Sequence, residues 1–198
     1  MNGRTRADLE AYGSTPMIHN PFNGTLVYMK VRLAKLSDAA EIAEIYNHEV
    51  LSSVATFDLV PKSLEEQREW LRDRSGALPC IVAIDEEDAL VGWACLSKYR
   101  DRPAYGTSVE DSIYVHQSHQ GAGVGNLLLG ELTRLADEHG FHSTFARIAG
   151  ENPSSIALHA KHGFELVGVE KEVGRKFGQW LDVTLMQRLT PVGGSSSG

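Results

Sequence analysis

The sequence predicts an α/β domain in which a mixed β-sheet carries helices on both faces. Apolar stretches with the alternation of β-strands dominate the middle of the chain, and segments with helical periodicity separate them. The chain has 198 residues, of which 42% are hydrophobic and 23% charged, as expected of a globular protein with one core. We therefore expect one domain over residues 27–189, between a loosely ordered extension (1–26) and a flexible Gly/Ser tail (190–198).

The first half of the domain is expected to begin with a strand and two helices. Residues 27–33 alternate as in a strand, and Ser37 then caps a helix whose apolar face holds Ile42, Ile45, Tyr46 and Val50. Residues 63–66, Ser-Leu-Glu-Glu, form a capping box that opens a second helix. That helix is expected to end near Ser75-Gly76.

Strands predominate in the rest of the domain. Two apolar stretches flank an acidic turn and predict a hairpin, and further strands follow; together the expected ranges are 79–84, 89–97, 109–115, 141–148, 164–171 and 181–188. A long helix lies between the third and fourth of these and stops at Gly140. Asn152-Pro153 supply the cap and first turn of a short helix that stops at Gly163.

Charge and composition exclude several function classes. The formal net charge is −7 with no basic stripe, which argues against nucleic acid as a partner. No segment reaches the roughly 20 apolar residues of a membrane helix, and no secretory signal is evident, so we expect no membrane contact. The two cysteines, Cys80 and Cys95, lie in apolar runs and predict buried free thiols in a reducing, cytoplasmic setting.

Three His-x-x-His pairs raise the question of a metal: His116/His119, His139/His142 and His159/His162. A catalytic zinc needs a third protein ligand and an ordered second shell, and the His-Glu-x-x-His pattern is absent. We therefore expect no metal.

The most informative segment is a strand that leads into a glycine-rich turn and then a helix, at Gln120-Gly121-Ala122-Gly123-Val124-Gly125. Glycines let a backbone approach a ligand closely, and the first N–H groups of a helix have no intrahelical partner. Together with the helix dipole they form a site for phosphate. The P-loop and dinucleotide-binding patterns both fail here, because Gly-Lys-Ser/Thr is absent and the following strand has no acidic residue.

These residues resemble the Gln/Arg-x-x-Gly-x-Gly/Ala element of the GNAT acetyltransferases. A second segment, from Asn152 through Ser155 to Gly163-Phe164, resembles the family's Asn-x-x-Ser/Ala…Gly-Phe element. Further segments around Glu44–His48, Val109–His116 and Glu172–Asp182 are similar to the phosphinothricin and methionine sulfoximine acetyltransferase branch. The resemblance covers about residues 31–189, and it implies the GNAT fold, with a mostly antiparallel sheet of about seven strands.

The resemblance implies transfer of an acetyl group from acetyl-coenzyme A to a primary amine by direct attack on the thioester. The coenzyme would contact a set of largely backbone positions: Ile113, Tyr114, Val115, Gln120, Gly121, Ala122, Gly123, Val124, Gly125, Asn152 and Ser155. Glu110 is the expected general base, since it lies on a strand otherwise built to be buried, where desolvation raises the pKa of a carboxyl group. An outward-facing carboxylate or a structural ion pair is the alternative.

His159 and four other residues complete the expected site. His159 stands where many relatives outside this branch place a tyrosine that protonates the thiolate; substrate contact or simple packing are the alternatives. Arg100, Arg102 and Tyr105 are expected to bind an anionic substrate, because arginine matches carboxylate oxygens, or else to form a surface charge cluster. Phe57 is expected either to wall the substrate pocket or to pack in the interior.

The expected acceptor is a small amino-acid-like amine of the phosphinothricin, methionine sulfoximine or methionine sulfone type. Acetylation of a protein N-terminus, a lysine or a polyamine is the alternative enzyme function, and a non-catalytic coenzyme A sensor is the alternative outside catalysis. By analogy with the branch, the chain is expected to form a homodimer in which Lys176, Phe177 and Trp180 complete a shared pocket.

Overall fold

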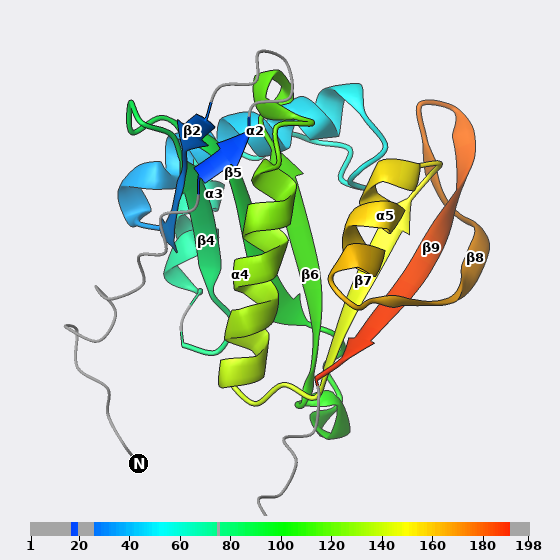
Figure 1. Ribbon diagram of the computed structural model, residues 1–198. Helices are drawn as coiled ribbons and strands as arrows, with labels where there is room; N and C mark the ends of the chain where they lie inside the picture. Colours follow the sequence, from blue (N-terminus) through cyan, green and yellow to red (C-terminus); the bar gives the residue numbers. More distant parts are fainter. Residues whose placement is uncertain (1–16, 20–25, 75, 191–198) are drawn as a thin grey trace, which may run out of the picture.

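The computed structural model describes residues 17–19, 26–74 and 76–190, and its core is a seven-stranded sheet (Figure 1). The strand order is β3-β4-β5-β6-β7-β9-β8. All neighbours are antiparallel except β6 and β7, which are parallel. The strands are β3 (Lys30–Leu33), β4 (Cys80–Ile84), β5 (Leu90–Lys98), β6 (Ser108–Val115), β7 (Ser143–Ala149), β8 (Glu165–Lys176) and β9 (Gln179–Leu189). The mixed, mostly antiparallel sheet expected from the sequence is confirmed.

Helices cover both faces of this sheet. α4 (Val124–Glu138) and α5 (Pro153–Lys161) lie on one face (Figure 1), and α2 (Ala39–Ser52) and α3 (Leu64–Arg72) pack on the other. The side chains of strand β4 point alternately to the two faces of the sheet. Ile81 and Ala83 pack with α4, while Cys80, Val82 and Ile84 pack with α2. Because both sides are covered, this strand is a continuous apolar run rather than an alternating one.

The two cysteines are buried and free, as predicted. Cys80 on β4 and Cys95 on β5 lie opposite each other in the strand register. Burial raises the pKa of both thiols, which keeps them protonated and unreactive.

Two expectations near the start of the domain are wrong. The strand expected over 27–33 is two strands in different sheets, because β2 (Leu26–Tyr28) pairs with β1 (Met17–His19) whereas β3 pairs with β4. Ser37 does not cap α2, since a 3-10 turn, η1 (Leu36–Asp38), precedes the helix. Asp38 holds that turn instead: its carboxylate accepts from the Lys35 backbone N–H at 2.6 Å and from the Arg32 guanidinium at 2.7 and 3.0 Å.

The other predicted helix signals are confirmed with small boundary shifts. Ser63 and Glu66 form the capping box of α3, which ends at Arg72, before the expected end near residue 76. Gly123 precedes α4 at a φ of 88°, in the left-handed region that favours glycine, and Asn152 caps α5. β8 extends to Lys176, beyond the predicted end at 171, because β9 pairs with it up to that residue.

The parallel strands β6 and β7 stay together over only part of their length. Their registered pairs are Ser108–Ser143, Val109–Thr144 and Glu110–Phe145. After Glu110 the two strands separate, and β7 continues beside β9 (Figure 1). The sheet therefore opens near its centre, immediately after a carboxylate.

Candidate active site

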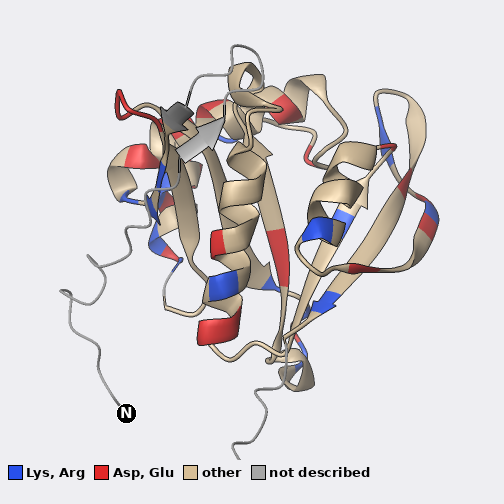
Figure 2. Ribbon diagram, in the orientation of Figure 1, with Lys and Arg blue, Asp and Glu red and all other residues tan. Residues whose placement is uncertain are grey.

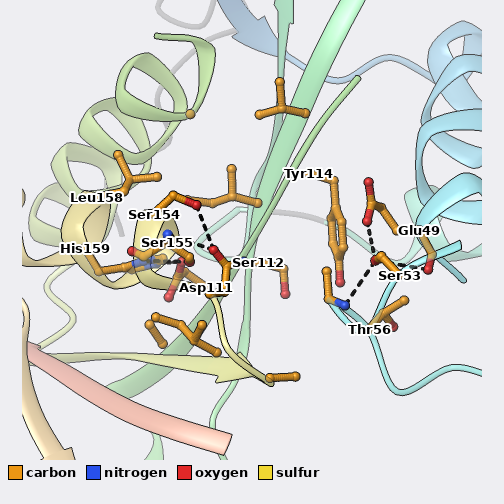
Figure 3. Close-up of a pocket in the computed structure, with 18 of the residues that line it drawn as sticks. Glu49, Ser53, Thr56, Asp111, Ser112, Tyr114, Ser154, Ser155, Leu158 and His159 are labelled. Carbon is orange, nitrogen blue, oxygen red and sulfur yellow. Dashed lines mark hydrogen bonds and ion pairs between the residues drawn. The ribbon is translucent and has the colours of Figure 1, made fainter. Parts of the chain in front are cut away.

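A cavity of about 860 Å³ occupies this opening (Figure 3). Its wall includes residues from the face covered by α4 and α5, among them Gly121, Gly123, Asn152, Ser155 and His159. It also includes residues from the face covered by α2, namely Glu49, Tyr114 and the segment 53–57. The cavity thus passes through the sheet, so two ligands could meet between β6 and β7 from opposite faces.

The glycine-rich turn forms one end of the cavity. Gly121 and Gly123 have φ of 76° and 88°, which other residues adopt only with strain. A Cβ on Gly125 would come within 3.2 Å of the Leu158 side chain, so glycine lets α4 approach α5 closely. The side chains of Ala122 and Val124 are buried, so only their backbone groups could serve a ligand. The turn and the start of α4 therefore fit a phosphate group.

Asn152 begins α5 on the other side of the same end. Its side-chain oxygen accepts from the Ser155 backbone N–H at 3.0 Å and from the Ser154 hydroxyl at 2.8 Å. The oxygen is therefore committed to capping the helix. The amide nitrogen of the side chain is the part of Asn152 that can donate to a ligand in the cavity.

Glu110 lies at the point where β6 and β7 begin to separate. Its side chain is partly buried in the cavity wall. Burial raises its pKa, the charges of Asp111 and Glu170 raise it further, and Arg147 and Arg100 oppose these effects. Figure 2 shows one acidic segment in β6, and the other residues of that strand are uncharged. The arrangement suits a carboxylate that takes up a proton more readily than an exposed one does.

His159 is buried and paired with a carboxylate that the sequence analysis did not single out. Its Nε2 lies 3.0 Å from Oδ2 of Asp111, and its Nδ1 lies 2.7 Å from the carbonyl oxygen of Ser155. Burial lowers the pKa of His159, but the hydrogen bond and charge of Asp111 outweigh that effect and raise it. An acidic residue inside a strand buried on both faces was the available signal for Asp111.

Phe57 lines the cavity on the α2 face. Its ring lies against the backbone of Gly174, where any Cβ would overlap it. The segment before it is fixed by Lys176, whose buried Nζ donates to the Thr56 carbonyl at 2.8 Å and the Glu49 carbonyl at 3.4 Å. Lys176 thus donates hydrogen bonds within its own chain, whereas Phe177 and Trp180 are exposed.

The predicted anion-binding residues lie apart from the cavity wall. Arg100, Arg102 and Tyr105 belong to an exposed loop that includes η2 (Pro103–Tyr105). The loop is linked to the site through Tyr99, which stacks at 4.0 Å on Phe145, the registered neighbour of Glu110. The cation in the wall itself is Arg147, which the sequence analysis missed and which forms an ion pair with Glu170.

Neither a metal site nor a membrane helix is evident in the described part of the chain. Within residues 17–19, 26–74 and 76–190, no group of three or more His, Cys, Asp or Glu side chains is placed to hold a metal ion. Over the same ranges, no helix has the length and apolar character needed to span a bilayer.

Comparison with known proteins decides the family. The model for the acetyltransferase (GNAT) domain matches residues 31–185. This chain belongs to the GNAT acetyltransferase family. A phosphinothricin N-acetyltransferase of Streptomyces coelicolor is 39% identical to it over 163 residues, which are 81% of this chain and 95% of that protein. A methionine sulfoximine/methionine sulfone acetyltransferase of Salmonella typhimurium is 38% identical over 80% of this chain and 93% of that protein.

Solved structures agree with the sequence comparisons. A GNAT phosphinothricin acetyltransferase from Sinorhizobium meliloti, crystallised with acetyl-coenzyme A, is 42% identical, with a TM-score of 0.79 over 81% of this chain and 88% of that one. This GNAT acetyltransferase therefore falls in the phosphinothricin and methionine sulfoximine branch, and it is an acetyl-coenzyme A-dependent N-acetyltransferase.

Proposed function

We propose that this enzyme acetylates the primary amine of a small amino-acid-like acceptor, of the phosphinothricin, methionine sulfoximine or methionine sulfone type, by direct attack on the thioester. One observation carries the proposal: the cavity passes through the sheet beside Glu110. An amine on the α2 face and a coenzyme on the α4/α5 face would reach the same opening. The names of the most similar relatives support this class of acceptor.

The α4/α5 side has the groups that a coenzyme A molecule needs. The backbone of the turn at residues 120–125 would hold the pyrophosphate, and the amide nitrogen of Asn152 would donate to the amide arm. The half of β6 that leaves β7, residues 113–115, offers backbone groups to the same arm and to the thioester carbonyl. When bound, the coenzyme supplies an activated acetyl group.

Glu110 would act as the general base on the α2 side. An amino-acid substrate arrives as an ammonium ion and needs to lose a proton before its nitrogen can attack. A carboxylate whose pKa is raised by burial is a better proton acceptor than an exposed one, and its position at the end of the β6–β7 pairing places it beside the opening. We expect activity to rise with pH through the raised pKa of Glu110.

The acceptor's carboxylate would bind to arginine. Arg147 lines the cavity and follows Phe145, the partner of Glu110, by two residues, so its side chain lies on the same face of the sheet. Arg100, Arg102 and Tyr105 would assist from the loop linked through Tyr99. An arginine-to-glutamine change at Arg147 or Arg100 is then expected to raise the KM for the amino acid without weakening coenzyme binding.

The test is release of thiol from acetyl-coenzyme A with phosphinothricin, methionine sulfoximine, methionine sulfone and spermidine as parallel acceptors. We expect turnover of the first three, and a loss of about 10²- to 10⁴-fold in kcat for Glu110→Gln with coenzyme affinity unchanged. Glu165→Gln, an exposed carboxylate on β8, is the matched control. Turnover of spermidine alone would overturn the acceptor class. Full activity of Glu110→Gln would overturn the role of Glu110.

A further inference from the structure

Segment 53–57, which follows α2, forms a wall of the cavity and spans the opening in the sheet. It continues from α2, which packs on β4 and β5. Beyond the opening its side chains meet two glycines: Val54 lies against Gly150, just after β7, and Phe57 lies against Gly174 on β8. A Cβ on either glycine would come closer than 3.0 Å to these side chains. The segment therefore connects the two parts of the sheet that separate after Glu110.

Lys176, the last residue of β8, carries a buried positive charge beside this segment. It is 3% exposed, and among the lysines and arginines of the described chain it alone is buried. Lysine is rarely buried without a partner. Here the partners are two backbone carbonyl oxygens, since Nζ donates to Thr56 at 2.8 Å and to Glu49 at 3.4 Å. The Phe177 ring adds a cation–π contact, with its centroid 5.2 Å from Nζ.

The two carbonyl groups lie where α2 ends and where the segment forms the wall. The Glu49 carbonyl belongs to the last turn of α2 and also accepts the Ser53 N–H at 3.1 Å. Carbonyl groups at the end of a helix carry partial negative charge, so a cation is favourable there. Figure 3 shows Glu49, Ser53 and Thr56 on the opposite side of the cavity from His159. Lys176 therefore binds the segment at both of its ends.

Tyr46, on α2, binds the same segment through its hydroxyl group. That hydroxyl is 3.0 Å from Oγ1 of Thr56 and donates to Oδ2 of Asp58 at 2.6 Å. Oγ1 of Thr56 also accepts the Asp58 N–H at 3.2 Å. The side chain of Thr56 is thus bound to α2 and its carbonyl to β8, and the next residue is Phe57. The position of Phe57 in the wall depends on both attachments.

We propose that Lys176 is a positioning residue for the acceptor side of the cavity: its ammonium group holds segment 53–57 where Phe57 forms the wall. Lys176 does not itself line the cavity, so it acts through the segment. The inference rests on the proposed acetylation of an amino-acid-like acceptor. A segment that occupies its place in only a fraction of the molecules lowers the apparent affinity for the acceptor by that fraction. The proposed coenzyme contacts lie on the α4/α5 face and do not involve this segment.

The first test compares acceptor and coenzyme binding in Lys176→Met. Methionine keeps an unbranched apolar side chain but removes the donors, so the Thr56 carbonyl loses the hydrogen bond from Nζ. We expect the KM for the acceptor to rise about 10-fold, with kcat within about 3-fold and the Kd for acetyl-coenzyme A unchanged. Lys171→Met, at an exposed lysine of the same strand that binds Asp182, is the matched control. An unchanged acceptor KM, or an equal weakening of coenzyme binding, would overturn the proposal.

A double-mutant cycle tests whether Lys176 acts through Phe57. Phe57→Leu alone is expected to raise the KM for the acceptor, because the ring forms part of the wall. If Lys176 acts by placing that ring, Lys176→Met adds little to Phe57→Leu, and the two effects on KM are less than additive in free energy. Lys176→Met combined with Asn152→Asp, on the coenzyme side, is expected to be additive. Full additivity with Phe57→Leu would contradict the positioning role.

Amide hydrogen exchange tests the placement of the segment without turnover. The N–H of Ala55 donates to Oγ of Ser53 at 3.1 Å, and the N–H of Asp58 donates to Oγ1 of Thr56, so both exchange slowly only while the segment is held in place. We expect Lys176→Met to speed exchange in peptides that cover residues 53–58 and to leave α3 unchanged. Exchange at the wild-type rate in this variant would show that Lys176 does not hold the segment.

The outcomes separate this inference from the proposed function. If the wild-type enzyme acetylates none of the acceptors, the proposed function fails, and hydrogen exchange still decides whether Lys176 holds the segment. If the wild-type enzyme turns over, an unchanged acceptor KM in Lys176→Met overturns the role of Lys176 alone. Thermal melting identifies a Lys176→Met protein that fails to fold. Tyr46→Phe then supplies the comparison, because it releases the Thr56 side chain from α2, and an unchanged acceptor KM and exchange rate in it would refute the proposal.

Discussion

At the scale of single residues, how closely two groups can pack shapes the cavity as much as charge does. Gly174 is the example on the α2 side of the cavity: it has no positive φ, yet a Cβ there would overlap the Phe57 ring. The glycine is therefore needed for space rather than for backbone conformation. Because Gly174 has no side chain, the Phe57 ring can lie against its backbone. Phe57 in turn forms part of the cavity wall.

Gly174→Ala is expected to displace Phe57 and change the acceptor pocket while leaving the coenzyme side intact. We expect the KM for the amino acid to change about tenfold, equivalent to about 1.4 kcal/mol, with an unchanged Kd for acetyl-coenzyme A. Gly168→Ala is the control on the same strand, because its Cβ would meet no atom within 4 Å. Steady-state kinetics and calorimetry measure both quantities. Equal kinetics in the two variants would exclude Phe57 as a determinant of acceptor binding.

At the scale of elements, α5 combines a structural cap with a proposed ligand-binding position. The side-chain oxygen of Asn152 satisfies the Ser155 N–H at the start of the helix, and the same helix presents His159 one turn further on. The cap therefore contributes both to the stability of the helix and to the position of the histidine. The side-chain oxygen caps the helix, and the side-chain nitrogen is the proposed donor to the coenzyme, so substitutions can separate the two roles.

Asn152→Asp is expected to keep the cap, because a carboxylate also accepts from the helix N–H, but to lose the donor to the coenzyme. Asn152→Ala is expected to lose both, with a destabilisation of about 1 kcal/mol. Denaturant unfolding and the Kd for coenzyme A measure the two effects. A normal Kd in Asn152→Asp would show that the side-chain nitrogen does not bind the coenzyme.

At the scale of the whole molecule, the edge of the sheet at β8 exposes apolar surface. The exposed residues on β8, on β9 and in the turn between them are Leu166, Val167, Val169, Val173, Phe177 and Trp180. An exposed apolar edge strand favours pairing with another chain, and patches of this kind mark protein interfaces. The homodimer expected by analogy with the branch would bury this surface, with β8 as part of its interface.

Leu166→Glu or Trp180→Glu is expected to shift the expected dimer toward the monomer, because burying an unpaired carboxylate in an apolar interface is costly. The sedimentation coefficient in analytical ultracentrifugation measures the shift. Leu36→Glu is the control: Leu36 is 46% exposed but precedes α2, in η1. The same sedimentation for all variants, whether monomeric or dimeric, would remove β8 from the interface.

Local signals in the sequence predict most of the helices and strands, and they single out Glu110 as a candidate site residue. The capping box at Ser63, the glycine turn before α4 and the Asn152 cap depend on contacts within a few residues, so the sequence predicts them directly. The same holds for the apolar runs of β4 and β5. Glu110 could be selected because a carboxylate in a buried strand is unusual wherever the strand lies.

The tertiary structure decided which residues meet across long distances. Asp111 and His159 are 48 positions apart, and Lys176 and Thr56 are 120 apart; no local pattern relates them. The segment 27–33 divides at Met29 because its two halves pair with strands of different sheets. The alternation of apolar residues along the segment does not show which strands pair. The sequence determined the residue types and the local geometry, whereas the folded sheet decided the pairs, because strand order and the separation of β6 from β7 arise only from packing.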